Sequence, residues 1–323
     1  MKKYDVIALG ELLIDMTDNG LSAQGNTLFE ANPGGAPCNV LAMLNKLGHR
    51  VGFIGKVGDD IFGHKLRAVL NEVGIDTSNL LIDKDCRTTL AFVENQADGD
   101  RSFSFYRNPG ADMMLTKADV HEELLKDCRI FHFGTLSMTH DKVREATKYA
   151  VETARESDAL ISFDPNIREM LWDSMDNARI QVEYGLGMCD ILKISDNEIQ
   201  WLTGEMDFTE GVKKIREKFP IPLILVSMGR EGSRAYYMDG ANEIVVEEPS
   251  VLREDTIETT GAGDTFMGCV LHNILEHGLE GRTAEELTEM LRFANAAASA
   301  ITTRKGALRV MPDAEEIRGN MRS

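Results

Sequence analysis

The sequence is short of paired cysteines, of positive charge and of long apolar runs, and each shortage argues against a class of protein. Its five cysteines lie far apart with no Cys-x-x-Cys pair, so neither a disulfide framework nor a structural zinc site is expected. The seven histidines show no metal-ligand spacing. The net charge of −18 disfavours nucleic acid as a partner, because such binding depends on Lys and Arg at the phosphates.

No apolar run is long enough to span a membrane, and the N-terminal residues lack the apolar stretch and cleavage site of a signal peptide. We therefore expect a cytoplasmic protein with no membrane partner. The 323 residues are 43% hydrophobic, which is enough for a sizeable core.

Strand-like and helix-like segments alternate along the chain, which predicts an α/β fold. Such alternation is typical of a mostly parallel, doubly wound sheet with helices on both faces, whose ligands lie at the carboxyl ends of the strands. We expect one domain over residues 1–323. The expected strands are 51–57, 128–134, 159–164, 191–194 and 223–227, and the clearest helices are 36–47, 141–156, 265–277 and 283–302.

Two stretches, residues 11–33 and 86–108, interrupt that alternation. Both have strand and turn signals with no helix between them, and the second predicts a hairpin around residues 97–100. We expect these stretches to form a small β-sheet lid on the main sheet.

The most informative motif is TTGAGD at residues 259–264, directly before a helical segment. Small residues let backbone N–H groups approach an anion, and a helix N-terminus adds partial positive charge. A carboxylate at Asp264 makes sense if it takes a proton from a hydroxyl that attacks a phosphate. The alternative is that Asp264 only complements the helix dipole.

A second helix start carries polar groups suited to a ligand with several hydroxyls. The pair Gly34 and Gly35 allows close backbone approach, and Asn39 presents an amide on the first helical turn. Asp15, at the end of an early strand, offers a carboxylate that can accept hydrogen bonds from vicinal hydroxyls. Without that carboxylate, the glycine pair would indicate only a tight turn before a helix.

Four motifs in order resemble the ribokinase-like (PfkB) sugar kinases, and most of all their bacterial fructokinase branch. They are GELLID at 10–15, GGAPCNV at 34–40, DPNIRE at 164–169 and TTGAGD at 259–264, and the resemblance runs from about residue 4 to residue 312. It implies a ribokinase-like α/β sheet with a β lid, and transfer of the γ-phosphate of ATP to a sugar hydroxyl.

The resemblance implies a catalytic group around the last motif. Asp264 is similar to the family's general base, and the N–H groups of Gly261, Ala262 and Gly263 to its anion hole. Arg168 resembles an arginine directed at the transferring phosphate; the alternative is a surface arginine paired with a neighbouring acid.

The sugar-binding residues implied by the resemblance are Asp15, Gly34, Gly35, Asn39, Asp264 and, on the lid, Phe105. Arg107, also on the lid hairpin, is expected to reach substrate when the lid closes, with a solvated hairpin arginine as the alternative.

The nucleotide-binding residues implied are Lys193, Ser227, Gly229, Gly232, Gly263 and Asn295. The small residues around Asn295 are equally compatible with close helix packing. Glu198 resembles a glutamate that supports Mg²⁺ through water, although Ser195-x-x-Glu198 is also the pattern of a helix capping box.

The expected reaction is the ATP- and Mg²⁺-dependent phosphorylation of fructose on its 6-hydroxyl. A 2-keto-3-deoxygluconate kinase, whose substrate acid Arg107 would bind, and a non-catalytic sugar-binding paralogue stay open as alternatives. Glu258 replaces the aspartate that many relatives have in a loop that binds a monovalent cation, which leaves potassium dependence open. A homodimer through the lid is expected because an exposed β edge invites pairing.

Overall fold

The main body of the protein is a nine-stranded, mostly parallel sheet, described here from a computed structural model that covers residues 2–95 and 101–321. The strand order is β13-β12-β11-β10-β9-β8-β1-β4-β5. The strands from β11 to β5 run parallel, and β12 and β13 add an antiparallel edge. The strands are β1 (Tyr4–Leu9), β4 (Val51–Gly58), β5 (Asp76–Asp83), β8 (Cys128–Gly134), β9 (Leu160–Asp164), β10 (Ile191–Ser195), β11 (Leu223–Ser227), β12 (Ser233–Asp239) and β13 (Asn242–Glu248).

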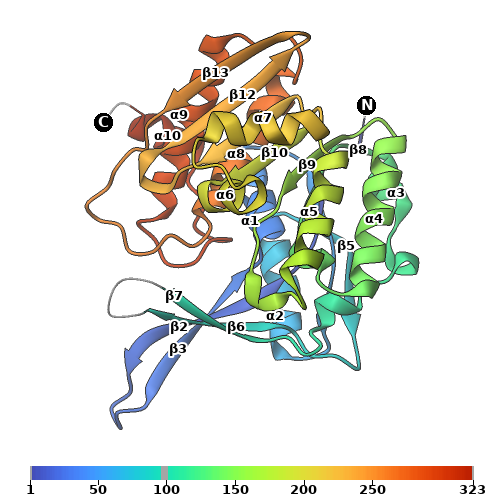
Figure 1. Cartoon of the computed structure of the whole chain (residues 1–323). Helices are drawn as coiled ribbons and strands as arrows, with labels where there is room; N and C mark the ends of the chain where they lie inside the picture. Colours follow the sequence, from blue (N-terminus) through green and yellow to red (C-terminus); the bar gives the residue numbers. More distant parts are fainter. Residues whose placement is uncertain (1, 96–100, 322–323) are drawn as a thin grey trace.

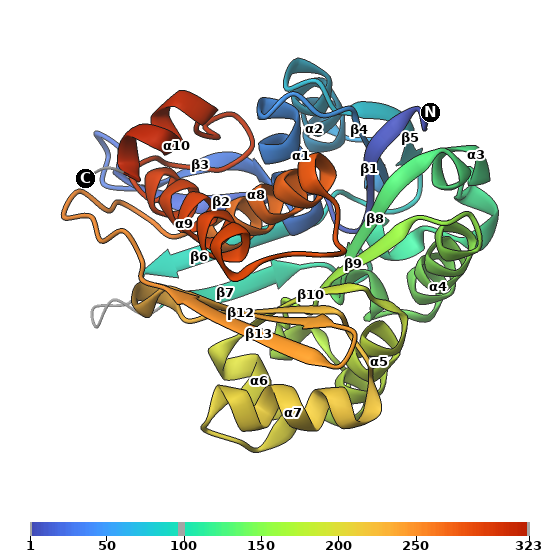
Figure 2. The same ribbon diagram turned by 90° about the horizontal axis from the view of Figure 1, so that it is seen from above.

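Helices cover both faces of this sheet (Figures 1 and 2). One face packs against α1 (Ala36–Lys46), α2 (Ile61–Glu72), α8 (Ala262–His277), α9 (Ala284–Ile301) and α10 (Ala314–Asn320). The other packs against α3 (Glu122–Lys126), α4 (Asp141–Glu156), α5 (Met175–Met188), α6 (Asp196–Thr203) and α7 (Phe208–Lys218). The strand β1 separates the two cores, because Val6 and Ala8 face one and Ile7 and Leu9 the other. The predicted doubly wound α/β fold is confirmed.

A second, four-stranded sheet projects from the main body (Figure 1). Its strand order is β3-β2-β6-β7, with β2 and β6 parallel and both outer pairs antiparallel. We call it the small sheet. The hairpin turn predicted around residues 97–100 lies outside the described residues. The strands of the small sheet are β2 (Leu13–Leu21), β3 (Thr27–Gly34), β6 (Leu90–Asn95) and β7 (Arg101–Tyr106).

Local capping explains where several helices begin. The predicted capping box at α9 is present, with Thr283 Oγ1 accepting from the Glu286 N–H and the Glu286 carboxylate accepting from the Thr283 N–H. The helix α8 begins at Ala262, three residues before the predicted start at Thr265, so Gly263 and Asp264 lie within its first turn. Within residues 2–95 and 101–321, the helices are too short or too polar to cross a bilayer.

Candidate active site

Two cavities meet at the first turn of α8. The inner cavity, of about 450 Å³, is lined by residues that include Glu11, Asp15, Asn39, Phe105, Arg168 and Asp264. The outer cavity, of about 310 Å³, lies against β11, α9 and the segment that follows β13. Both cavities are lined by Thr259 and Gly263, so the turn that carries the TTGAGD motif separates them.

The turn before α8 presents a helix N-terminus to both cavities. Gly261 is the N-cap residue and has φ of 76°, a left-handed conformation that favours glycine. The first N–H groups of a helix have no acceptor within it, which leaves partial positive charge here. The Ala262 N–H donates to Thr259 O at 3.2 Å, so one of the three N–H groups predicted to form an anion hole is already engaged within the turn.

Asp264 lies on the inner cavity, with a hydrogen bond from the first turn of α1. Asn39 Nδ2 donates to Asp264 Oδ2 at 2.7 Å. Burial raises the pKa of Asp264 to about 6, although the hydrogen bond from Asn39 and the charges of Lys193 and Arg168 act in the opposite direction. Asn39 Oδ1 is buried, and among the described residues no group donates to it.

Asp15 faces the same cavity from β2. Its carboxylate lies so close to Gly34 that a Cβ on that residue would be 2.4 Å from Oδ2. Burial raises the pKa of Asp15 to about 7, opposed by the charge of Arg168 and reinforced by the carboxylates of Glu258 and Asp264. The absence of a side chain at Gly34 therefore leaves room for the Asp15 carboxylate, and Gly34 itself does not line the cavity.

Gly35 and Glu11 together shape the start of α1. Gly35 has φ of 132°, and a Cβ there would lie 2.4 Å from Glu11 O. Glu11 Oε1 accepts from the Ala36 N–H at 2.8 Å and so caps α1 in place of a conventional N-cap side chain. Burial raises the pKa of Glu11 to about 7.

A buried ion pair lies behind the α8 turn. Lys193 Nζ is 2.9 Å from Asp164 Oδ2, and both side chains are less than a tenth exposed. The ammonium also approaches Gly263, because a Cβ on that glycine would be 3.2 Å from Nζ. Asp164 Oδ1 is buried and receives no hydrogen bond from any described residue. Lys193 thus places positive charge beside the first turn of α8.

Arg168 lines the inner cavity and a neighbouring side cavity of about 330 Å³ that also contains Lys193 and Glu198. Its charge lowers the pKa of both Asp15 and Asp264, which shows that the guanidinium lies near these two carboxylates. Arg168 therefore lies on the wall of the inner cavity, near Asp15 and Asp264.

Glu198 and Ser195 form the helix capping box that the sequence offered beside a Mg²⁺ role. Its Oε2 accepts from Ser195 N and Ser195 Oγ, both at 2.9 Å, and its Oε1 accepts from Ile167 N at 2.7 Å. Glu198 nevertheless lines the side cavity. The same carboxylate caps α6 and fixes the segment that carries Arg168.

Arg107 is not placed as the sequence predicted. Its guanidinium is buried, 2.6 Å from Asp112 Oδ2, and it also donates to Thr139 Oγ1 and Leu136 O. It therefore faces the interior below β7, neither reaching into the inner cavity nor standing in solvent. Phe105, two residues earlier, does line the cavity.

The outer cavity contains the residues predicted for the nucleotide. Ser227, Gly229 and Gly232 line it at the end of β11. Asn295 also lines it, but its amide is engaged: Nδ2 donates to Glu248 O and Pro249 O, and Oδ1 accepts from Ser233 Oγ. Asn295 therefore holds the wall of the outer cavity in place, and its side chain also lines that cavity.

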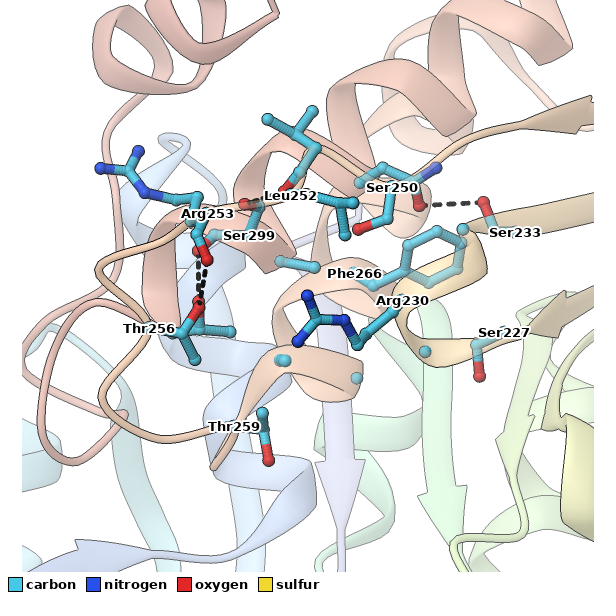
Figure 3. A pocket seen from close by; sticks show the side chains of 18 residues that line it. Ser227, Arg230, Ser233, Ser250, Leu252, Arg253, Thr256, Thr259, Phe266 and Ser299 are labelled. Atoms are coloured by element: carbon cyan, nitrogen blue, oxygen red, sulfur yellow. Dashed lines mark hydrogen bonds between the residues drawn. The ribbon is translucent and has the colours of Figure 1, made fainter. Parts of the chain in front are cut away.

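The fold also brings to these cavities several residues that the sequence motifs do not single out. Arg230 extends over the outer cavity (Figure 3), and Glu11 and Asn166 line the inner one. The available signals were weak: Arg230 is a single basic residue in the SMGREG turn, and Asn166 stands inside a motif already chosen for Arg168. Asn166 has φ of 44°, which is uncommon outside glycine.

Known proteins resemble this chain over almost its whole length. The model of the pfkB family of carbohydrate kinases matches residues 3–314. Fructokinase-1 of Zea mays is 39% identical over 314 residues, which cover 97% of this chain and 96% of that protein. Fructokinase-2 of Solanum lycopersicum is 38% identical over 313 residues, covering 96% of this chain and 94% of that protein.

Solved structures agree with these relatives. The fructokinase of Xylella fastidiosa with bound ATP has a TM-score of 0.86 and 30% identity, over 98% of both chains. The fructokinase of Vibrio cholerae O395 in its fructose-, ADP- and calcium-bound form has a TM-score of 0.86 and 28% identity, over 98% of this chain and 99% of that one. The resemblance inferred from the four motifs is confirmed: the chain belongs to the pfkB family of carbohydrate kinases.

Proposed function

We propose that the protein transfers the γ-phosphate of ATP to the 6-hydroxyl of fructose. The observation that carries the proposal is the position of Asp264, a half-buried carboxylate with a raised pKa, at the helix turn where two cavities meet. A hydroxyl in one cavity and a phosphate in the other would meet beside this carboxylate. The fructokinases among the relatives, one of them solved with fructose and ADP, support fructose as the acceptor.

The sugar would bind in the inner cavity. Asp15 accepts hydrogen bonds from neighbouring hydroxyls, and the unoccupied acceptor Asn39 Oδ1 takes another. Asp264 then removes the proton of the attacking hydroxyl as general base. Phe105 covers the sugar from the small sheet, which we propose acts as a lid that excludes water.

The developing negative charge would be stabilised from several sides. The N-terminus of α8 at Gly261 and Gly263 directs N–H groups and partial positive charge at the phosphoryl group. Arg168 and Lys193 add full positive charges close by, which matters in a chain with a net charge of −18. The Ala262 N–H is already bound to Thr259 O, so Ala262 contributes more by shaping the turn than by donating to the phosphoryl group.

The nucleotide would occupy the outer cavity, with its phosphates directed at Gly263. Ser227, Gly229 and Gly232 line the end of β11 and permit close approach, and Arg230 lies over the opening. Asn295 supports the wall beside the base.

The residues of the side cavity fit a Mg²⁺ ion that accompanies ATP. Glu198 lines the side cavity and presents a carboxylate whose oxygens already accept hydrogen bonds, which suits an ion held through water. Asp164 lies behind Lys193, which lines the same cavity, and among the described residues its buried Oδ1 receives no hydrogen bond. Glu198 and Asp164 would hold the ion. Mg²⁺ neutralises phosphate charge when it is bound.

The buried position of Arg107 removes the support for a keto-acid substrate. The guanidinium expected to bind the acid group is committed to Asp112, and the curated relatives matched over almost the whole chain are fructokinases. A non-catalytic paralogue is disfavoured because Asp264 and the two glycines of the turn are all present. We further propose a cytoplasmic setting, in keeping with five free thiols, and a homodimer formed through the small sheet.

A coupled ADP-release assay tests the reaction with ATP, Mg²⁺ and a panel of fructose, 2-keto-3-deoxygluconate, ribose, tagatose and adenosine. Selective turnover of fructose is expected. Asp264→Asn should lower kcat by about 10²–10⁴-fold while fructose still binds, as measured by calorimetry. Asp190→Asn is the matched control, because Asp190 is a half-buried carboxylate before β10, at the opposite end of the sheet, whose pKa burial also raises. Equal turnover by Asp264→Asn and wild type would refute the general-base assignment, and turnover of another acceptor alone would refute fructose.

A further inference from the structure

Three potential metal ligands converge between α1 and α8, at the ends of these helices that lie away from the active site. They are His49, in the turn after α1, and His272 and Glu276, one helical turn apart on α8. One ligand atom from each lies within 4.8 Å of the other two. His49 Nε2 and His272 Nδ1 are 2.7 Å apart. Nothing in the proposed phosphoryl transfer uses these side chains.

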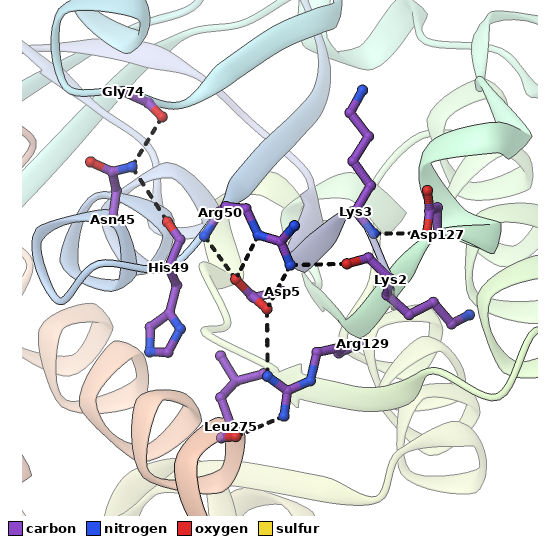
Figure 4. Close-up of polar contacts among 10 residues, drawn as sticks. All are labelled: Lys2, Lys3, Asp5, Asn45, His49, Arg50, Gly74, Asp127, Arg129 and Leu275. Carbon is purple, nitrogen blue, oxygen red and sulfur yellow. Dashed lines mark hydrogen bonds and ion pairs between the residues drawn. The ribbon is translucent and has the colours of Figure 1, made fainter.

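The surroundings of the cluster suit a bound cation. His49 is buried and His272 is partly buried, while Glu276 is exposed. The nearby Arg129 is engaged by Leu275 O at 2.7 Å and by Asp5 Oδ1 at 3.4 Å (Figure 4), so an acidic partner balances its charge.

We propose that His49 Nε2, His272 Nδ1 and the Glu276 carboxylate bind one divalent transition-metal ion such as Zn²⁺. Two nitrogens on tetrahedral zinc lie about 3.3 Å apart, given Zn–N distances of 2.0–2.1 Å, so the imidazoles need to separate by only about 0.6 Å. Water completes the coordination. An entry path exists, because His272 also lines a surface cavity with His277 and Glu289. Arg292 and Arg318 line this cavity as well, and Arg292 is paired with Glu248 and Glu289.

The ion would link the C-terminal end of α1 to the C-terminal end of α8, opposite the ends that carry Asn39 and Asp264. At the other end, Asn39 on α1 donates to Asp264 on α8. Between them the helices are in close contact, since a Cβ on Gly268 would lie 2.7 Å from Met43 Cβ and 3.1 Å from Val40 O. Metal binding therefore stabilises the folded protein without touching the reacting groups.

Calorimetric titration of untagged, chelator-treated enzyme with Zn²⁺ tests the site. Excess Mg²⁺ is kept present to occupy oxygen-rich sites. One Zn²⁺ per chain is expected for wild type, and about tenfold weaker binding or worse for His272→Gln and Glu276→Gln. His277→Gln is the matched control, because His277 lines the same cavity outside the cluster, and it should bind as wild type does.

Two further readouts separate binding from folding. Zn²⁺ at a hundredfold excess over Kd should raise the Tm of wild type by about 5 °C, and this shift should vanish in Glu276→Gln, whose exposed side chain is not needed for packing. Turnover with Mg²⁺ and ATP should be the same in all variants without Zn²⁺. Absence of Zn²⁺ binding, or equal binding by wild type and both ligand variants, would overturn the proposal.

Discussion

Burial controls the protonation of the acidic side chains around the inner cavity. It raises the pKa of Glu11 and of Asp15 to about 7 and that of Asp264 to about 6. The lower value of Asp264 has a local cause, because Asn39 donates a hydrogen bond to its carboxylate. A base with a pKa just below neutral is ionised at physiological pH and still basic enough to accept a proton.

The first prediction concerns the pH profile. Because Asp264 must be ionised to act as base, kcat/KM should rise with pH through about 6 to 7, the range in which Asp264 and Asp15 lose their protons, and level off above it. Asn39→Ala removes a hydrogen bond that lowers the pKa of Asp264, so the acid limb should move to higher pH. Rates from about pH 5 to about pH 9 check this. An unmoved limb would mean that another group controls the profile.

The second prediction concerns stability. The pKa of Asp15 in the folded protein, about 7, lies above its unfolded value of about 3.9, so stability is lost as the pH rises from about 4 to about 7 and the carboxyl ionises. Asp15→Asn removes that loss. Its Tm should exceed that of wild type by about 6–8 °C at about pH 8 and match it near pH 4, as scanning calorimetry would report.

Catalysis fails in this variant if Asp15 holds the sugar, so stability and activity change in opposite directions. A Tm below that of wild type at about pH 8 would show instead that the carboxylate stabilises the fold.

Helices whose ends are set by neighbouring residues could be predicted from the sequence. The capping residues of α9 and the proline and glycines around α1 are readable from sequence, and α4 has the bounds predicted for it. The start of α8 was placed three residues late, because Gly261 and Gly263 are poor helix formers and a conventional cap is missing. Contacts with α1 and Lys193 fix that first turn, and they come from distant parts of the chain.

The third prediction tests how β3 supports the active site. Gly34→Ala places a Cβ 2.4 Å from Asp15 Oδ2, so the carboxylate must move away from its position on the cavity wall. We expect KM for fructose to rise about tenfold or more, with a smaller change in kcat, because a misplaced acceptor costs about 1–3 kcal/mol.

Gly187→Ala on α5 is the control, since its new Cβ would meet only Phe219, at 3.8 Å. Steady-state kinetics on both variants decide the matter. An unchanged KM in Gly34→Ala would show that Asp15 does not bind the sugar.

Contacts between remote segments of the chain cannot be predicted from local sequence patterns. Arg107 was expected at the substrate because it lies on the small sheet near Phe105, but its direction depends on Asp112 and on the distant Leu136. His49 and His272 are 223 residues apart, so no spacing rule brings them together. Asp15, Asn39 and Asp264 could be predicted as candidates because each stands in a motif whose chemistry is readable locally, and all three line the inner cavity.

The last prediction concerns assembly. The small sheet has β3 and β7 as its edge strands and exposes Leu21, Leu28 and Phe29, a combination that invites pairing with a second copy. We expect a dimer in sedimentation velocity, converted to a monomer by Leu28→Glu, because a carboxylate buried at the contact without a partner is strongly unfavourable.

Ile180→Glu is the matched control, because Ile180 is 60% exposed on α5, away from the small sheet. If both variants and wild type have the same mass, whether monomer or dimer, the small sheet is not the interface. If only Leu28→Glu dissociates and its KM for fructose also rises, the partner holds the small sheet over the inner cavity, and assembly and substrate binding depend on the same strands.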